Sequence, residues 1–249
     1  MNATDVIAAL EFPSTCRIDQ RLSKKLLIEK MTPTAGDKKR INDGIDSLIW
    51  LAALKPTTTG IAEHRDDTRS YLEIAILALT ARPKAKTPRL IELIHRAIPH
   101  PTLLLTEQGE TVTLSLAHIR PHQGHAGKTV LDNLPLTARL DDLAAPINQD
   151  FRAAMALSRQ PSQTLLALYQ GWIDTVIALQ AAALTGQFRP NAQPSASRAE
   201  ALARIRQLEK RTAELRKAAT REKILARQID LNLDIKRLQA EIAAAQDQL

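Results

Sequence analysis

The sequence predicts an α/β protein of the α+β kind, in which helices flank a small mixed sheet. A helical segment and then a long C-terminal coiled-coil helix follow the sheet. Two patterns support this fold class. Apolar residues recur at helical spacing in the first 54 residues and again after residue 148, whereas apolar and β-branched runs separated by turn residues lie between them. A third observation is that the last 53 residues contain neither Gly nor Pro, which favours a long helix.

The N-terminal region contains three segments with helical periodicity, over residues 4–10, 21–31 and 37–54. Thr32-Pro33-Thr34 separates the second from the third. The prediction for the third, longest helix rests on apolar residues that follow a 3.6 period: Ile41, Ile45, Leu48, Ile49, Leu51 and Leu54.

Strand-like segments follow. Residues 57–62 are short and β-branched, and residues 70–81 form a long apolar run that suits the centre of a sheet. A helix is expected over residues 89–98, after two prolines. Residues 102–106 and 111–119 alternate on either side of Gln108-Gly109-Glu110, which predicts a hairpin.

The second half is expected to be helical, apart from an edge strand over residues 130–136. Helices are predicted over residues 151–157 and 161–184, and the Pro- and Ser-containing stretch after them is the clearest domain boundary. The predicted domains are an α/β sheet domain (1–145), a helical hairpin packed on it (146–185), a linker (186–197) and a coiled-coil helix (198–249).

The C-terminal helix carries a heptad seam, with apolar residues at alternating spacings of three and four. A step of five between Ala219 and Ile224 implies a discontinuity near Thr220. Because an isolated helix cannot bury its apolar stripe, we expect a second copy, the helix at 161–184 or another protein to cover it. The seam consists of Ile205, Leu208, Leu215, Ile224, Leu231, Ile235, Leu238, Ile242 and Leu249.

The chain is basic, with a net charge of +7 and a pI near 9.7, so nucleic acid, an acidic protein or an anionic membrane surface would suit it electrostatically. The C-terminal cations can equally form a solvated face with i,i+4 ion pairs. The candidate nucleic-acid-binding residues are Lys24, Lys25, Lys38, Lys39, Arg40, Arg204, Lys210, Arg211 and Lys217.

Cysteine usage and hydropathy indicate a cytoplasmic protein. The single Cys16 excludes a disulfide framework and a cysteine-based zinc site. The N-terminus lacks the pattern of a secretory signal, and no run of eighteen apolar residues occurs. No phosphate-binding loop or dinucleotide motif is present, so no cofactor is predicted.

Two groups of residues could bind a metal ion. His118, His122 and His125 lie close in sequence, but Pro121 and Gly124 prevent a regular helix, so we interpret them as a polar loop.

Glu63, Asp66 and Glu73 surround the strand-like region, where a nuclease of the restriction-enzyme fold would place two carboxylates and a Glu-x-Lys motif around magnesium. Glu73 is followed by Ile74-Ala75, so the motif is incomplete. We therefore expect no catalytic residues and keep these three as the alternative.

Residues 12–188 resemble a bacterial domain-of-unknown-function family. The resemblance rests on FPSTCRIDQRLSKKLLIEK, IDSLIWLAALKPTT, YLEIAILAL, HRAIPHPTLLLTEQGETVTLSLAHIR and LYQGWIDTVIALQAAALTGQF. Members of this family are typically encoded beside a Swi/Snf-like helicase and a type III-like DNA methyltransferase in defence islands. The resemblance implies a DNA-processing complex and supplies no catalytic motif.

Two functional hypotheses follow from these observations. The first is a non-enzymatic accessory or adaptor subunit of a DNA restriction or anti-phage defence complex. It would assemble through its coiled coil with itself, as a homodimer, or with helicase and methyltransferase subunits, and DNA is a candidate ligand. The alternative is a degenerate or cryptic metal-dependent nuclease of the restriction-enzyme fold.

Overall fold

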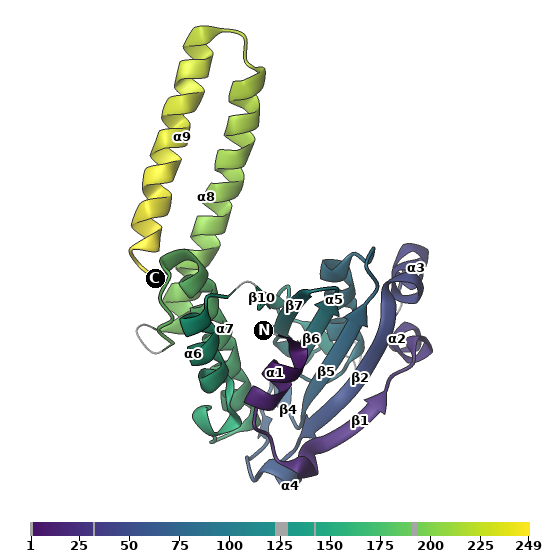
Figure 1. The fold of residues 1–249 in the computed structure, drawn as a ribbon. Coiled ribbons are helices and arrows are strands. Elements are labelled where there is room, and N and C mark those ends of the chain that lie inside the picture. The colour runs from purple at the N-terminus through teal and green to yellow at the C-terminus, as the bar shows by residue number, and fades with distance from the viewer. Residues whose placement is uncertain (1, 32, 123–128, 142, 191–193) are drawn as a thin grey trace. The chain divides into compact units, whose positions relative to one another are not determined.

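The computed structural model describes residues 2–31, 33–122, 129–141, 143–190 and 194–249. A six-stranded sheet has the order β1-β2-β5-β6-β7-β10 (Figure 1). Neighbouring strands are antiparallel except β5 and β6, which are parallel. The strands are β1 (Arg17–Arg21), β2 (Ile45–Leu54), β5 (Ile74–Ala81), β6 (Thr102–Gln108), β7 (Thr111–Ala117) and β10 (Leu136–Arg139).

Two short strand pairs and the helices complete the described elements. The pairs are β3 (His64–Arg65) with β4 (Ser70–Tyr71), and β8 (Ile119–Pro121) with β9 (Thr129–Leu131). The α-helices are α1 (Ala3–Ala9), α2 (Lys24–Lys30), α3 (Ala35–Gly44), α4 (Pro56–Thr59), α5 (Thr87–Ala97), α6 (Ala145–Met155), α7 (Leu165–Thr185), α8 (Ser195–Arg221) and α9 (Leu225–Gln246). The predicted α/β fold with a mixed sheet and a long C-terminal helix is confirmed.

The chain divides into two compact units, residues 1–176 and 177–249. The division falls inside α7, upstream of the predicted linker at 186–197, and α8 already begins within that predicted linker. The first unit contains the sheet, and we call it the sheet unit. The second contains the end of α7 with α8 and α9.

Helices α2, α3 and α5 pack on one another and share a hydrophobic core with β2, β5 and β6. The central strand β5 contributes Ala75, Leu77 and Leu79 to this core, while Ile74 and Ile76 are buried as well. Alternate residues of β5 point to opposite faces of the sheet and are buried on both, which is why the sequence reads there as a continuous apolar run.

The predicted helix over residues 37–54 is wrong in its second half. Helix α3 ends at Gly44, and residues 45–54 form strand β2 between β1 and β5. The apolar residues of this stretch suit either structure, and pairing with the apolar strand β5 overrides the helical spacing. Gly44 marks the change, because it lies against Leu90 of α5 where a larger residue would not fit.

The expected strand at 57–62 is also wrong, since residues 56–59 form the short helix α4. Pro56 occupies its first turn and Gly60 ends it with φ of 73°, which is the usual placement of these two residues. The predicted helix at 21–31 is shorter than expected, because Ser23 caps its start before Lys24. The predicted hairpin is confirmed, with Gly109 at φ of 60° between β6 and β7.

The C-terminal segment is two antiparallel helices and not one continuous helix (Figure 1). Residues 222–224 separate α8 from α9, close to the predicted discontinuity. Of the predicted seam residues, Ile205 and Leu208 on α8 and Ile235 and Leu238 on α9 are buried. Ile224, at the turn, is 50% exposed. Four of the nine predicted seam residues are thus buried within the chain, where α8 packs against α9, and the expected coiled-coil partners stay a prediction.

Helix α7 is the one described helix that is long and apolar enough to cross a membrane by length and composition. In its most apolar stretch, 67% of the helix is buried in the protein. Core helices of folded proteins show the same pattern, as the fully buried side chains of Leu168, Tyr169 and Trp172 illustrate.

Candidate functional site

Polar and charged side chains gather at the sheet end where β2 and β7 finish and β5 and β6 begin. Leu54 pairs with Ile74, so the residues that follow β2 and precede β5 are brought together. The parallel crossover through α5 returns the chain to this end just before β6. This arrangement gathers Lys55, Glu73 and His100, which we call the sheet-end cluster.

An ion pair is the centre of the sheet-end cluster. Lys55 Nζ lies 3.1 Å from Glu73 Oε2, and His100 Nε2 lies 3.9 Å from Glu73 Oε1. Glu73 is only 14% exposed, whereas Lys55 is 47% exposed. The imidazole of His100 also contacts the Trp50 ring, with centroids 6.1 Å apart.

Burial lowers the pKa of His100, and the Lys55 ammonium lowers it further, while the Glu73 carboxylate acts in the opposite direction. His100 is therefore neutral at pH 7. The cluster pairs one carboxylate with one ammonium beside a neutral imidazole.

Glu73 is the one candidate acid of the nuclease alternative that belongs to the sheet-end cluster. The other two candidate acids lie elsewhere. Glu63 is exposed in the segment between α4 and β3. Asp66 accepts hydrogen bonds from the Thr68 and Arg69 backbones in the turn between β3 and β4. Among the described residues, no three His, Cys, Asp or Glu side chains are grouped to hold a metal ion.

A buried hydrogen-bond network lies nearby and was not predicted from the sequence. The Tyr71 hydroxyl bonds to His118 Nδ1, and His118 Nε2 lies 2.9 Å from Gln170 Oε1. Gln170 Nε2 in turn donates to Asp174 Oδ1 over 2.7 Å. The Tyr169 hydroxyl donates to the Thr102 carbonyl and accepts from the Ala117 backbone N–H. The network therefore connects α7 to β4 and to the ends of β6 and β7.

The chain of bonds assigns the tautomer of His118. Because Gln170 Nε2 donates to Asp174, Gln170 Oε1 must accept, so His118 carries its proton on Nε2. Nδ1 then accepts from the Tyr71 hydroxyl. Burial lowers the pKa of His118 and raises that of Tyr71 to about 12, so both are neutral at pH 7. Tyr71 and Tyr169 are fully buried, whereas His118, Gln170 and Asp174 are partly exposed, so the network ties α7 to the sheet from the interior to the surface.

The three histidines that lie close in sequence, His118, His122 and His125, do not form one site among the described residues. His118 belongs to the buried network, and His122 is exposed after β8. His125 lies outside the described residues. Only the register of β4 and β7 with α7 brings Tyr71, His118 and Gln170 together, and no local pattern signals such a long-range contact.

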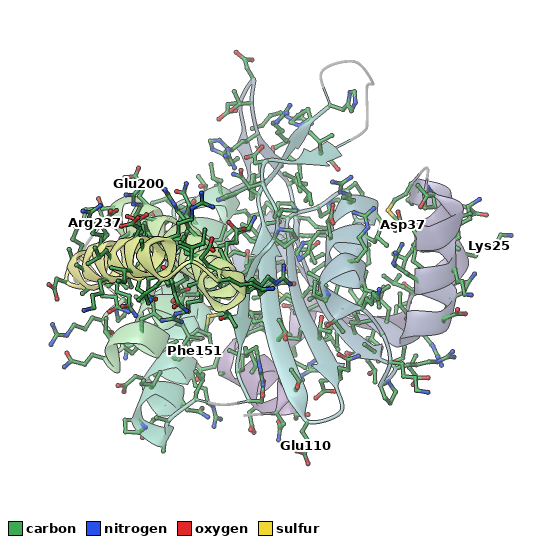
Figure 2. All side chains as sticks on the ribbon, turned by 90° about the horizontal axis from the view of Figure 1, so that it is seen from above. Lys25, Asp37, Glu110, Phe151, Glu200 and Arg237 are labelled. Carbon is green, nitrogen blue, oxygen red and sulfur yellow. The ribbon has the colours of Figure 1, made fainter. Side chains whose placement is uncertain are left out.

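The candidate nucleic-acid-binding residues of the sheet unit lie on two adjacent helices. Lys24 and Lys25 belong to α2, and Lys38, Lys39 and Arg40 belong to α3. We call these five residues the α2–α3 face. Figure 2 shows Lys25 extending outward from α2, whereas Asp37 of α3 lies on the inner side, where it pairs with Arg89.

Acidic residues neutralise this face only in part. Lys25 lies 3.7 Å from Glu29, and Arg40 lies 3.2 Å from Asp37. Lys38 and Lys39 are exposed and have no acidic partner among the residues that the structure describes. The face therefore presents unpaired ammonium groups to solvent.

Lys24 lies where further cations converge. Burial lowers its pKa most, and the Arg82 and Arg21 guanidinium groups lower it further, while the Asp46 and Asp43 carboxylates act in the opposite direction. Its ammonium donates to the Asn42 carbonyl over 2.8 Å. Lys24 therefore lies in a mixed environment of two arginines and two aspartates.

The C-terminal candidates do not form one surface. Lys210 and Lys217 are seven residues apart on α8 and share a side, as do Arg204 and Arg211, but the two sides are roughly 120° apart around the helix. Arg204 is paired with Glu241 of α9 over 2.6 Å. These residues therefore belong to a solvated hairpin with cations on more than one side.

Comparison with known proteins gives a family and no function. The family model described as Domain of unknown function (DUF4391) matches residues 10–242. Neither a curated protein nor a solved structure matches the chain.

Proposed function

The chain belongs to the DUF4391 family, and from this premise we propose that it is a non-enzymatic accessory subunit of a DNA restriction or anti-phage defence complex, which contacts DNA through the α2–α3 face. The observation that supports DNA contact best is the pair of exposed ammonium groups of Lys38 and Lys39 on α3, which have no acidic partner among the described residues and lie beside the lysines of α2. Lysines placed in this way bind phosphates and release condensed counterions, without a need for base-specific contacts.

The defence context comes from the resemblance to proteins encoded beside helicases and methyltransferases. It makes those two enzymes the proposed partners, and the cytoplasm, where DNA restriction takes place, the proposed location. The chain's net charge of +7 is consistent with a DNA-bound subunit.

DNA binding is tested by fluorescence anisotropy with a labelled duplex at several salt concentrations. We expect the double variant Lys38→Gln/Lys39→Gln to bind about tenfold more weakly at low salt and to lose about two units of the slope of log K against log salt. The matched control is Arg152→Gln/Arg159→Gln, which removes two exposed cations of α6 and the following turn. Equal loss in both variants, or no binding by the wild type at low salt, contradicts the proposal.

A metal-dependent nuclease is the second candidate, because Glu73, one of its three candidate acids, lies 3.1 Å from the Lys55 ammonium at adjoining strand ends. Against it stands the finding that, among the described residues, no three His, Cys, Asp or Glu side chains are grouped to hold a metal ion. Plasmid digestion with Mg²⁺ or Mn²⁺ separates the two candidates. We expect no cleavage; cleavage lost in Glu73→Ala but kept in Glu63→Ala would establish the nuclease and overturn the non-enzymatic proposal.

A further inference from the structure

Helix α9 has a second apolar stripe, on roughly the opposite side from the residues that pack against α8. Its two large apolar members are exposed: Ile229 is 51% and Leu233 48% exposed. The stripe continues along the helix through exposed alanines. With spacings of three and four residues, this outer stripe consists of Ala226, Ile229, Leu233, Lys236, Ala240 and Ala243.

Such spacing is that of the a and d positions of a heptad repeat, which form the contact between two packed helices. The buried inner residues Ile235 and Leu238 belong to other heptad positions and already contact α8 within the chain. Helix α9 is thus apolar on two sides, and only one of them is covered. Apolar side chains exposed in a row along a helix favour association.

The two halves of the outer stripe differ in size. Its first half has the large side chains of Ile229 and Leu233, and its second half has the small side chains of Ala240 and Ala243. A reversed copy of the same helix would place Ile229 opposite Ala240, and Leu233 opposite the aliphatic stem of Lys236. Large residues facing small ones are how closely packed helices interdigitate.

The charges beside the outer stripe also match those of a reversed copy of the same helix. One flank has Asp230 and Arg237, seven residues apart, and Arg237 also lies 3.2 Å from Asp234 of its own helix. The other flank has the uncharged Asn232 and Gln239. In an antiparallel pair of helices each flank meets the same flank of the partner. Asp230 of each copy then lies opposite Arg237 of the other, so the contact is made twice.

We infer that the outer stripe of α9 binds a second copy of this chain, with the two α9 helices antiparallel. A parallel pair would place Lys236 against Lys236 and the charged flank against uncharged amides, so it would gain no ion pair and add a repulsion. A reversed copy of α9 matches both the side-chain sizes and the charges along the outer stripe. This match favours a two-fold homodimer over a foreign partner.

The first test measures the mass of the full chain by light scattering and sedimentation between about 1 and 100 μM. We expect a dimer that the variant Ile229→Glu dissociates, with at least a tenfold weaker association. The control is Leu134→Glu, which replaces another exposed leucine in the sheet unit. A monomer at every concentration, a dimer that Ile229→Glu leaves intact, or association only with a foreign protein overturns the inference.

The second test uses charge reversal and reports the orientation. Asp230→Arg and Arg237→Asp, each alone, should weaken the homodimer several-fold, because each places like charges opposite one another twice. An equimolar mixture of the two variants should form a heterodimer of wild-type strength, since every pair is then opposite in charge. If the mixture does not associate with wild-type strength, the antiparallel register is excluded.

This inference does not depend on DNA binding, so the two proposals can fail separately. Single-site binding of a short duplex by the α2–α3 face should survive Ile229→Glu, and the dimer should survive Lys38→Gln/Lys39→Gln. Far-ultraviolet circular dichroism of Ile229→Glu confirms that the hairpin remains folded, because Ile229 is half exposed and lies outside the contact with α8.

Discussion

Asp37 is the residue that most directly stabilises the helical layer beneath the α2–α3 face. Its carboxylate is 5% exposed and accepts two hydrogen bonds from Arg89 of α5, at 3.1 and 2.7 Å, and one from Arg40 at 3.2 Å. The Arg89 guanidinium and the Thr34 hydroxyl lower the pKa of Asp37 to about 2, against the effect of burial. One buried anion therefore holds α3 to α5 while the exposed lysines beside it stay unpaired.

We expect Asp37→Asn to lower the free energy of unfolding by about 3 kcal/mol at pH 7, because the amide leaves the Arg89 guanidinium without its bidentate partner. Urea denaturation followed by circular dichroism measures this. The control Asp46→Asn removes a carboxylate that is 61% exposed and 3.8 Å from Arg82, and should change stability by less than about 0.5 kcal/mol. A similar effect of both substitutions would show that the ion pair at Asp37 is not stabilising.

At the same scale, the sequence identified the acid of the sheet-end cluster but not its partners. Glu73 stands out as an acidic residue just before an apolar run. Lys55 and His100 look like ordinary surface residues, because their contact with Glu73 depends on strand register and on the crossover through α5. Residue type and spacing predict chemistry only where the ligands are close in sequence.

The helix α3 and the strand β2 show where periodicity is ambiguous at the scale of an element. Ile41 and Ile45 fit a helical stripe, yet the chain changes structure between them, at Gly44. A Cβ atom on Gly44 would lie 2.8 Å from Leu90 Cδ1 and 3.3 Å from Ala85 Cβ. The end of α3 thus packs directly on α5, a contact that the apolar pattern does not reveal.

Replacing Gly44 by Ala should therefore destabilise the protein by about 1–3 kcal/mol, because the added methyl group is forced against the packed Leu90 side chain. Gly36, in the first turn of the same helix, is the matched control. A Cβ there meets only the end of the flexible Arg40 side chain and the Thr34 hydroxyl, so Gly36→Ala should be neutral or stabilise by up to about 1 kcal/mol. Thermal unfolding compares the two variants, and equal effects would contradict close packing at Gly44.

The C-terminal helices show a second ambiguity of the sequence pattern, between a partner helix in the same chain and one in another chain. The heptad pattern and the step of five residues near Thr220 predicted both the seam and its interruption. They did not predict that the chain reverses there, because a seam has the same sequence pattern whether its partner helix is intramolecular or intermolecular. Gln228, which reads as a polar seam position, instead donates to the Ala219 carbonyl at the end of α8 over 3.3 Å.

At the scale of the whole molecule, the basic charge is spread over surfaces, and three histidines, one buried and two partly buried, have lowered pKa values. His95 is 2% exposed in α5, and its Nε2 lies 3.0 Å from the Ser115 hydroxyl of β7. Burial lowers the pKa of His95 to about 3, and it also lowers the pKa of His118 and of His100. A histidine held neutral in the folded state but free to protonate when unfolded makes stability depend on pH.

The direction of that dependence follows from proton counting. Below pH 6.5 the unfolded chain binds protons at these histidines that the folded chain cannot, so the stability present above pH 6.5 is lost as pH falls. His95 alone should account for about 2 kcal/mol between pH 7 and pH 5. Asp37 contributes only in a lower window, because its stabilisation is present above pH 3.8 and disappears as the pH falls towards 2.

We therefore expect the free energy of unfolding to be constant from about pH 7 to 8 and to fall steadily from pH 6.5 to 5, long before carboxylates protonate. Urea titrations at half-unit pH intervals measure the slope. His95→Gln should have a lower free energy of unfolding at pH 7 but a shallower decline towards pH 5. A flat profile down to pH 5 would mean that the buried imidazoles protonate without unfolding the core.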